Sequence, residues 1–129
     1  MRAAFAAGGI GHGHVRMVPG GTVGLYLISL ENGERSFSYW RSQSAARQLA
    51  EDPVALEKAM GEAELIYFSG ITLAILDAAS REVFLSALRA ARAGGKTIAF
   101  DPNLRPRLWP SEAEMREAVM QGAAVSDIA

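Results

Sequence analysis

The chain has 129 residues, a length typical of a single domain with one hydrophobic core. Thirteen basic and fourteen acidic residues give a formal net charge of -1, and no run of Lys or Arg offers a surface for nucleic acid. The absence of cysteine excludes disulfides, thiolate catalysis and cysteine-based zinc sites, and fits a cytoplasmic protein. No stretch approaches the ~20 apolar residues that cross a bilayer, so we expect neither nucleic acid nor membrane as a partner.

The first predicted element is a short helix at the N-terminus. Met1 to Ala7 is rich in good helix formers, and Gly8-Gly9 then end the helix. Because the chain opens inside this helix, we expect that sequence upstream of it is missing.

A β-hairpin is predicted next. Thr22–Leu30 and Glu34–Trp40 are rich in strand formers, and the Asn-Gly between them is a strong signal for a type I′ turn. Counting outward from that turn pairs Tyr26 with Tyr39 and Gly24 with Arg41. Paired residues project from the same side of a ribbon, so Tyr26, Tyr39 and Arg41 are predicted to share one face.

The remaining residues predict an α/β core. Helical patterns cover Ser44–Ala50 and Pro53–Ala63, and the continuous apolar run Glu64–Ile71 is typical of a strand covered on both faces.

A helix over Ser80–Ala93, capped by Ser80, then leads to a second buried strand at Lys96–Phe100. The two strands are therefore predicted to be parallel. A last helix over Ser111–Ala124 begins with the S-x-x-E capping box of Ser111 and Glu114.

The loop after the second buried strand carries the candidate site. Asp101, Asn103 and Arg105 alternate at this strand end, and Ser69-Gly70 end the preceding strand. Ligands of open α/β sheets bind at such ends, and an Arg fork suits a substrate carboxylate. The alternative is structural: Asp101 and Asn103 would cap turns between prolines, and Arg105 would be solvated.

Four segments resemble one family in the same order. They are VPGGTVGLYLI, GERSFSYWRSQSAA, YFSGITLAIL and DPNLRPRLW, the last matching a D-x-N-x-R-x-x-L-W pattern. Together they are similar to the 2-keto-3-deoxygluconate kinases, a group of ribokinase-like carbohydrate kinases. This sequence departs from that family's P-G-x-T-G-L-Y-L strand at Val23, where the family's Thr is shifted or absent.

The resemblance implies a ribokinase-like layered parallel sheet with helices and a small β-hairpin lid. Residues 1–129 would then form part of one such domain, with the lid at about 22–41 and the αβ core at about 53–129. Carried over by motif, Tyr26, Tyr39, Arg41 and Arg105 would bind the keto-deoxy sugar acid, and Asp101 and Asn103 would order the loop or face the phosphate. Cross-strand packing is the alternative role of the two tyrosines.

The same resemblance implies phosphoryl transfer from ATP with Mg2+. In the family the catalytic base is the aspartate of a Gly-Ala-Gly-Asp segment, and this string does not occur in the printed sequence. We therefore expect a chain that carries the sugar-binding part but no catalytic residue, no metal site and little of the nucleotide site, with weak or absent kinase activity. Sheet edges left exposed by missing strands would favour a homo-oligomer.

Two other functions remain open. A fructokinase- or ribokinase-type enzyme would share the fold but would not need paired arginines, and a non-catalytic sugar-binding or interaction module would lack turnover. His12 and His14 have no third ligand nearby and are interpreted as turn residues. Trp40 and Trp109 are interpreted as packing anchors.

Overall fold

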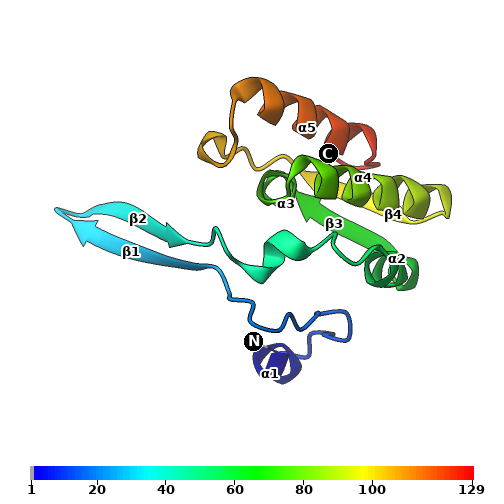
Figure 1. Ribbon diagram of the computed structural model, residues 1–129, viewed down its shortest axis with the longest axis horizontal. Helices are drawn as coiled ribbons and strands as arrows, with labels where there is room; N and C mark the ends of the chain where they lie inside the picture. Colours follow the sequence, from blue (N-terminus) through cyan, green and yellow to red (C-terminus); the bar gives the residue numbers. More distant parts are fainter. Residues whose placement is uncertain (1) are drawn as a thin grey trace. The chain divides into compact units, whose positions relative to one another are not determined.

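The computed structural model describes residues 2–129, which belong to two compact units, Met1–Ala45 and Ala46–Ala129 (Figure 1). The first contains a short helix and a hairpin, and the second contains the parallel strands with their helices. No helix among residues 2–129 is both long and apolar enough to span a membrane.

The first unit confirms the predicted helix and hairpin. Helix α1 covers Arg2–Ala7, and strands β1 (Leu25–Glu31) and β2 (Glu34–Trp40) pair antiparallel. Asn32 and Gly33 have φ values of 52° and 84°, as a type I′ turn requires at both central positions. The register is the predicted one, so the two-residue turn and the strand alternation were sufficient to place the side chains.

The beginning of the first strand differs from the prediction. β1 begins at Leu25, whereas Thr22 forms an isolated bridge with Ser44 and its hydroxyl donates to the Gln43 carbonyl, 3.0 Å away. Thr22 therefore ties the hairpin base to the segment that follows it.

The second unit contains the predicted strand-helix-strand arrangement, with more helices than expected. Strands β3 (Leu65–Ser69) and β4 (Thr97–Asp101) pair in parallel, and Ser69 lies opposite Asp101. In chain order, the helices are η1 (Ala45–Gln48, which starts at the unit boundary), α2 (Pro53–Glu62), α3 (Gly70–Ile75), α4 (Ala78–Ala93), η2 (Pro106–Leu108) and α5 (Glu112–Ala124).

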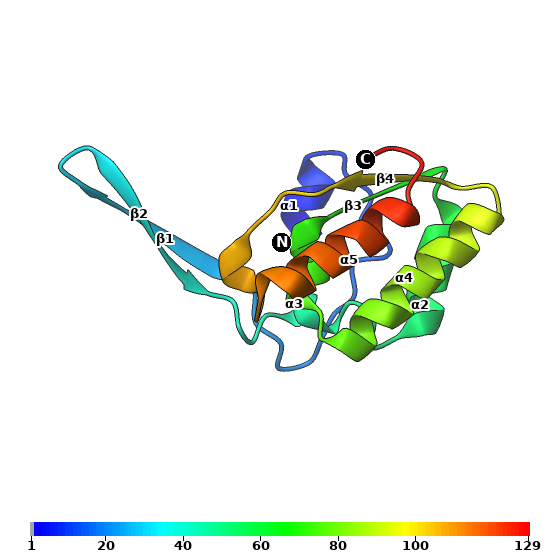
Figure 2. The same ribbon diagram turned by 90° about the horizontal axis from the view of Figure 1, so that it is seen from above.

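The core lies between one face of this sheet and the helices above it (Figure 2). Phe68 of β3 stacks on Phe100 of β4 with ring centroids 4.7 Å apart and meets Phe84 of α4 edge-on at 5.5 Å. Helix α5 reaches the same face, where a Cβ on Gly122 would lie 3.0 Å from the Phe100 ring. α4 and α5 therefore cover the same side of the strands.

The opposite face of the sheet is open in this chain. Leu65 and Tyr67 are 54% and 63% exposed, so the prediction of a strand covered on both faces is wrong for β3. An apolar run does not reveal how many faces are covered, because Leu and Tyr suit either environment.

Three helix starts also correct the sequence prediction. The pattern at Ser44–Ala50 forms only the 3-10 turn η1. The predicted strand Glu64–Ile71 ends at Ser69, because α3 begins at Gly70 with Ser69 and Thr72 as a reciprocal capping box. Helix α4 begins before Ser80.

Asp77 caps α4 in place of Ser80. Its Oδ1 accepts from the Ser80 N–H at 2.7 Å, and this bond, as the main cause, lowers the pKa of Asp77. At α5, Ser111 is the cap as predicted, with its hydroxyl accepting from the Glu114 N–H at 3.2 Å. The Glu114 carboxylate, however, pairs with Arg81 of α4, 3.1 Å away, rather than completing a capping box.

The C-terminal residues lie along β4. Ile128 bridges Ala99 in parallel, and the Asp127 carboxylate accepts from the Ile98 N–H at 2.9 Å and from Arg92 at 2.8 Å. The second edge of β4 is thus partly paired.

Candidate functional site

One face of the hairpin carries three aromatic rings and a guanidinium. Tyr26 lies across from Tyr39 with ring centroids 6.5 Å apart, and Phe37 stacks beside Tyr39 at 6.1 Å. The Arg41 guanidinium carbon lies 4.2 Å from the centre of the Tyr39 ring, which places the cation over its π face. We call Tyr26, Phe37, Tyr39 and Arg41 the hairpin cluster.

Gly24 leaves space at the base of this cluster. A Cβ added there would meet the Arg41 Cβ at 3.1 Å, so the missing side chain leaves room for the arginine. The hairpin cluster therefore confirms the predicted shared face of Tyr26, Tyr39 and Arg41. The tyrosines also pack on each other, with 65% and 51% of their surface exposed, so packing and an accessible phenol coexist.

The second candidate element is the loop that follows β4. The Asp101 carboxylate accepts from the Asn103 N–H at 3.0 Å through one oxygen and from the Tyr67 hydroxyl at 3.2 Å through the other. Asn103 has a φ of 32°, a left-handed conformation that Asn tolerates better than most residues. The carboxylate thus holds the first turn of the loop, which supports the loop-ordering role expected for Asp101 and Asn103.

Tyr67 is affected by this neighbour. Partial desolvation, then the negative charge of Asp101 and the hydrogen bond to it, raise the pKa of Tyr67. All three effects favour the neutral phenol, which remains a donor to Asp101 well above neutral pH.

The same loop passes very close to the end of β3. A Cβ on Gly70 would lie 2.0 Å from the Pro102 carbonyl oxygen, a contact that no side-chain carbon tolerates. Gly70 therefore allows the loop to cross the N-terminus of α3.

Arg105 follows that crossing and points along its own loop. Its Nη1 donates to the Leu104 carbonyl at 2.9 Å, and the Arg105 carbonyl accepts from the Leu108 N–H at 2.9 Å as η2 begins. The structure thus brings Asp101, Asn103 and Arg105 into one loop. Their convergence with the hairpin cluster on a single ligand stays a prediction.

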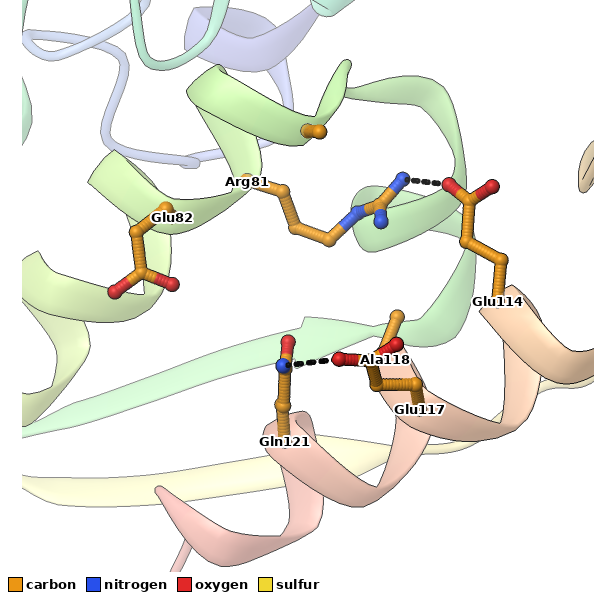
Figure 3. Close-up of a pocket in the computed structure, with 7 residues that line it drawn as sticks. Arg81, Glu82, Glu114, Glu117, Ala118 and Gln121 are labelled. Carbon is orange, nitrogen blue, oxygen red and sulfur yellow. Dashed lines mark hydrogen bonds and ion pairs between the residues drawn. The ribbon is translucent and has the colours of Figure 1, made fainter.

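A buried arginine lies at the far end of the loop, in a cavity of about 250 Å³ between α4 and α5 (Figure 3). Arg81 is only 9% exposed, and its guanidinium carbon lies 4.9 Å from the centre of the Trp109 ring. Trp109 is thus a packing anchor, as predicted. The cavity is lined by Ala78, Arg81, Glu82, Glu114, Glu117, Ala118 and Gln121.

Tyr67 and Arg81 were missed as contributors to the site, and Gly70 was placed at the strand end without its close contact to the loop. Period-two alternation would have placed Tyr67 on the same face as Ser69, beside Asp101 in a parallel pair. The Ser-Gly at the strand end was a signal for close backbone approach. Nothing local indicates the partners of Arg81, because they lie on other helices.

A metal ion would need a group of side chains able to hold it. Residues 2–129 contain no cluster of three or more His, Asp or Glu side chains that could hold a metal ion.

The parallel strand-helix-strand unit and the antiparallel hairpin form a partial α/β fold of the kind found in ribokinase-like sugar kinases. Comparison with known proteins identifies the family to which this fold belongs. The model of the pfkB family of carbohydrate kinases matches residues 1–129, and the chain belongs to that family.

Curated relatives include sugar-acid kinases and fructokinases. The chain is 48% identical over 109 residues to the 2-dehydro-3-deoxygluconokinase of Dickeya dadantii, covering 82% of this chain and 35% of that protein. The same enzyme of Escherichia coli is 43% identical over the same shares, and a Solanum tuberosum fructokinase is 34% identical over 84% and 32%. The chain spans about a third of the length of these relatives.

Solved structures support the same fold. A PfkB protein from Polaromonas superposes with a TM-score of 0.79 at 29% identity, covering 97% of this chain and 42% of its own. A Xylella fastidiosa fructokinase with bound ATP gives 0.78 at 26% identity, covering 97% and 38%.

Proposed function

We propose that this chain forms the sugar-binding part of an ATP-dependent kinase for 2-keto-3-deoxygluconate or a similar sugar acid. The observation that carries the proposal is the hairpin cluster, in which Arg41 is held over Tyr39 beside Tyr26. The names of the most similar curated relatives point to the same substrate.

The chemistry of the cluster suits an anionic sugar. A guanidinium presents a planar fork that matches a carboxylate, while phenols both donate to and accept from hydroxyl groups. Stacking on Tyr39 limits the orientations of Arg41, which lowers the entropy that a ligand must remove on binding. Arg105 would provide a second cation from the loop after β4, and Asp101 and Asn103 would order that loop.

Binding is the direct test, because the catalytic aspartate motif of the family does not occur in these 129 residues. We expect the chain to bind 2-keto-3-deoxygluconate in calorimetry and fructose more weakly. Arg41→Met should weaken binding of the acid roughly 10- to 100-fold, since a hydrogen bond to a charged group contributes about 1.5–3 kcal/mol.

Arg35→Met is the matched control, because Arg35 lies on the same hairpin but pairs with Leu30 near the turn. It removes the same charge and should leave the affinity unchanged. Equal loss in both variants, or no binding of the acid by the unaltered chain, would overturn the proposal.

A fructokinase-type function is the second candidate, supported by the fructokinases among the relatives and solved structures. Tighter binding of fructose than of the sugar acid would favour it. Robust turnover in an assay with ATP, Mg2+ and 2-keto-3-deoxygluconate would exclude a non-catalytic module and would contradict the expected lack of the catalytic part. We expect little or no turnover by the 129 residues alone.

A further inference from the structure

Arg81 is a buried cation whose hydrogen bonds reach three parts of the second unit. It lies in the first turn of α4 with 11% of its side chain exposed. A charged group this buried must be paired and hydrogen-bonded, since desolvation otherwise costs several kcal/mol. The positions of its partners therefore show which elements the guanidinium holds together.

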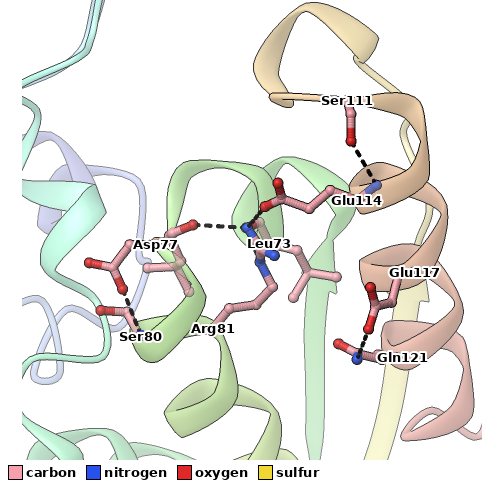
Figure 4. Close-up of polar contacts among 9 residues, drawn as sticks. Leu73, Asp77, Ser80, Arg81, Ser111, Glu114, Glu117 and Gln121 are labelled. Carbon is pink, nitrogen blue, oxygen red and sulfur yellow. Dashed lines mark hydrogen bonds and ion pairs between the residues drawn. The ribbon is translucent and has the colours of Figure 1, made fainter.

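Two of the partners are carbonyls at the end of α3 (Figure 4). Arg81 Nε donates to the Leu73 carbonyl at 3.0 Å, and Nη2 donates to the Leu76 carbonyl at 3.2 Å. Both leucines are buried, at 0% and 2% exposure. Arg81 thus fixes α4 against the C-terminal end of the short helix α3, where carbonyl groups lack helical partners.

The other partners belong to the segment that follows the candidate loop. Nη2 also donates to Glu114 Oε1 at 3.1 Å, in the first turn of α5, and the guanidinium lies against the Trp109 ring. Through Arg81, the C-terminal end of the loop is therefore connected to the end of α3, and the beginning of the loop crosses the start of the same helix, where Pro102 passes Gly70.

Arg105 is linked to Trp109 by the hydrogen-bonded turn η2. The Leu108 N–H donates to the Arg105 carbonyl at 2.9 Å, and the Trp109 N–H donates to the Pro106 carbonyl at 3.1 Å. Because these two hydrogen bonds join Arg105 and Trp109 through the single turn η2, we expect a displacement of Trp109 to move the backbone of Arg105.

We propose that Arg81 is a positioning residue for Arg105: it holds Trp109 and α5 against α3, and thereby sets the place from which Arg105 meets an anionic sugar. This inference rests on the proposed function and extends it to a residue outside the ligand-binding groups. In this role Arg81 acts through Arg105 and does not itself bind the sugar.

The test is a double-mutant cycle in the 129-residue chain. Arg81→Met removes the donors and the charge but keeps the aliphatic stem. At a urea concentration and temperature where each variant is folded by circular dichroism, we expect the dissociation constant for 2-keto-3-deoxygluconate to rise about tenfold. In an Arg105→Met background the same change should have no further effect, because Arg81 acts through Arg105.

Two further variants separate positioning from general stability. Arg89→Met removes the same group from the same helix, where Arg89 pairs with Glu82 at 2.8 Å on the surface, and should leave the affinity unchanged. Arg81→Lys keeps the charge and should recover part of the affinity. It also serves as the test variant if Arg81→Met does not fold.

Amide exchange at Leu108 and Trp109 reports loop order without any sugar. Faster exchange in Arg81→Met than in Arg89→Met would support the positioning of the loop by Arg81. If no sugar acid binds, the proposed function is overturned, but this result on loop order still stands. Unchanged exchange, or additive effects of Arg81→Met and Arg105→Met on affinity, would overturn the positioning role.

Discussion

Replacing Gly70 by alanine should damage the candidate loop more than the size of one methyl group suggests. The added Cβ would lie 2.0 Å from the Pro102 carbonyl oxygen and 3.0 Å from the Pro102 carbonyl carbon. Cβ atoms essentially never approach another atom closer than 3.0 Å, so the loop or α3 must move by at least about 1 Å.

The size of the effect follows from that displacement. Overpacking of a well-packed region costs about 1–3 kcal/mol, and the same displacement is passed along the loop toward Arg105. An error of about 1 Å in the position of a ligand-binding group can cost up to ~100-fold in activity. We therefore expect Gly70→Ala to be less stable and to bind 2-keto-3-deoxygluconate at least about tenfold more weakly.

Gly61 offers a matched control. It lies near the end of α2, and a Cβ there would meet nothing within 4 Å. Gly61→Ala should stabilise the chain by about 0.5–1 kcal/mol, because alanine loses less backbone entropy in a helix. Urea unfolding and calorimetry of both variants test the reasoning. If Gly70→Ala proves as stable as Gly61→Ala and binds with the same affinity, the close crossing at Pro102 does not position the loop.

The hairpin is the part that the sequence predicts best. A two-residue Asn-Gly turn fixes which residues face each other, and strand alternation then assigns every side chain to a face. The predicted pairing of Tyr26 with Tyr39 is confirmed for this reason, although neither residue is buried. This information is entirely local.

The helix that follows β3 shows where local information is insufficient. The segment after Ser69 is apolar except for Thr72, and a short apolar run suits a strand or a buried helix equally. The outcome depends on Gly70, whose lack of a side chain lets Pro102 pass, and Pro102 is 32 positions further along the chain.

Arg81 is a second case of long-range determination. Its position after Ser80 in a helical pattern suggests a surface residue, because arginines are mostly exposed. Two of its contacts are with Glu114 and Trp109, which lie about 30 positions further along the chain and reach Arg81 only in the tertiary structure. The contacts of Arg81 with Glu114 and Trp109 could therefore be found only from the tertiary structure.

Three further outcomes follow from the second unit. Leu88→Ala, at a position with 0% exposure, should lower the free energy of unfolding by about 2–5 kcal/mol in urea titration. A smaller loss would mean that neighbouring side chains move into the space that the leucine leaves. Tyr67→Phe tests the raised pKa of this phenol: the neutral form stabilises the fold below pH 10.0, and this contribution is lost as the pH rises through the raised value. The melting temperature of the unaltered chain should therefore fall more steeply above pH 10 than that of the variant, and parallel curves would contradict the bond to Asp101. Asp127→Asn tests a pKa shift in the opposite direction. The hydrogen bond from the Ile98 N–H, and after it Arg92, lowers the pKa of Asp127 below 3.8. The carboxylate stabilises the fold above pH 3.8 and loses this effect as the pH falls through the lowered value, so acid unfolding curves of the variant should be flatter in that window. Identical curves would show that the C-terminal residues do not hold the edge of β4.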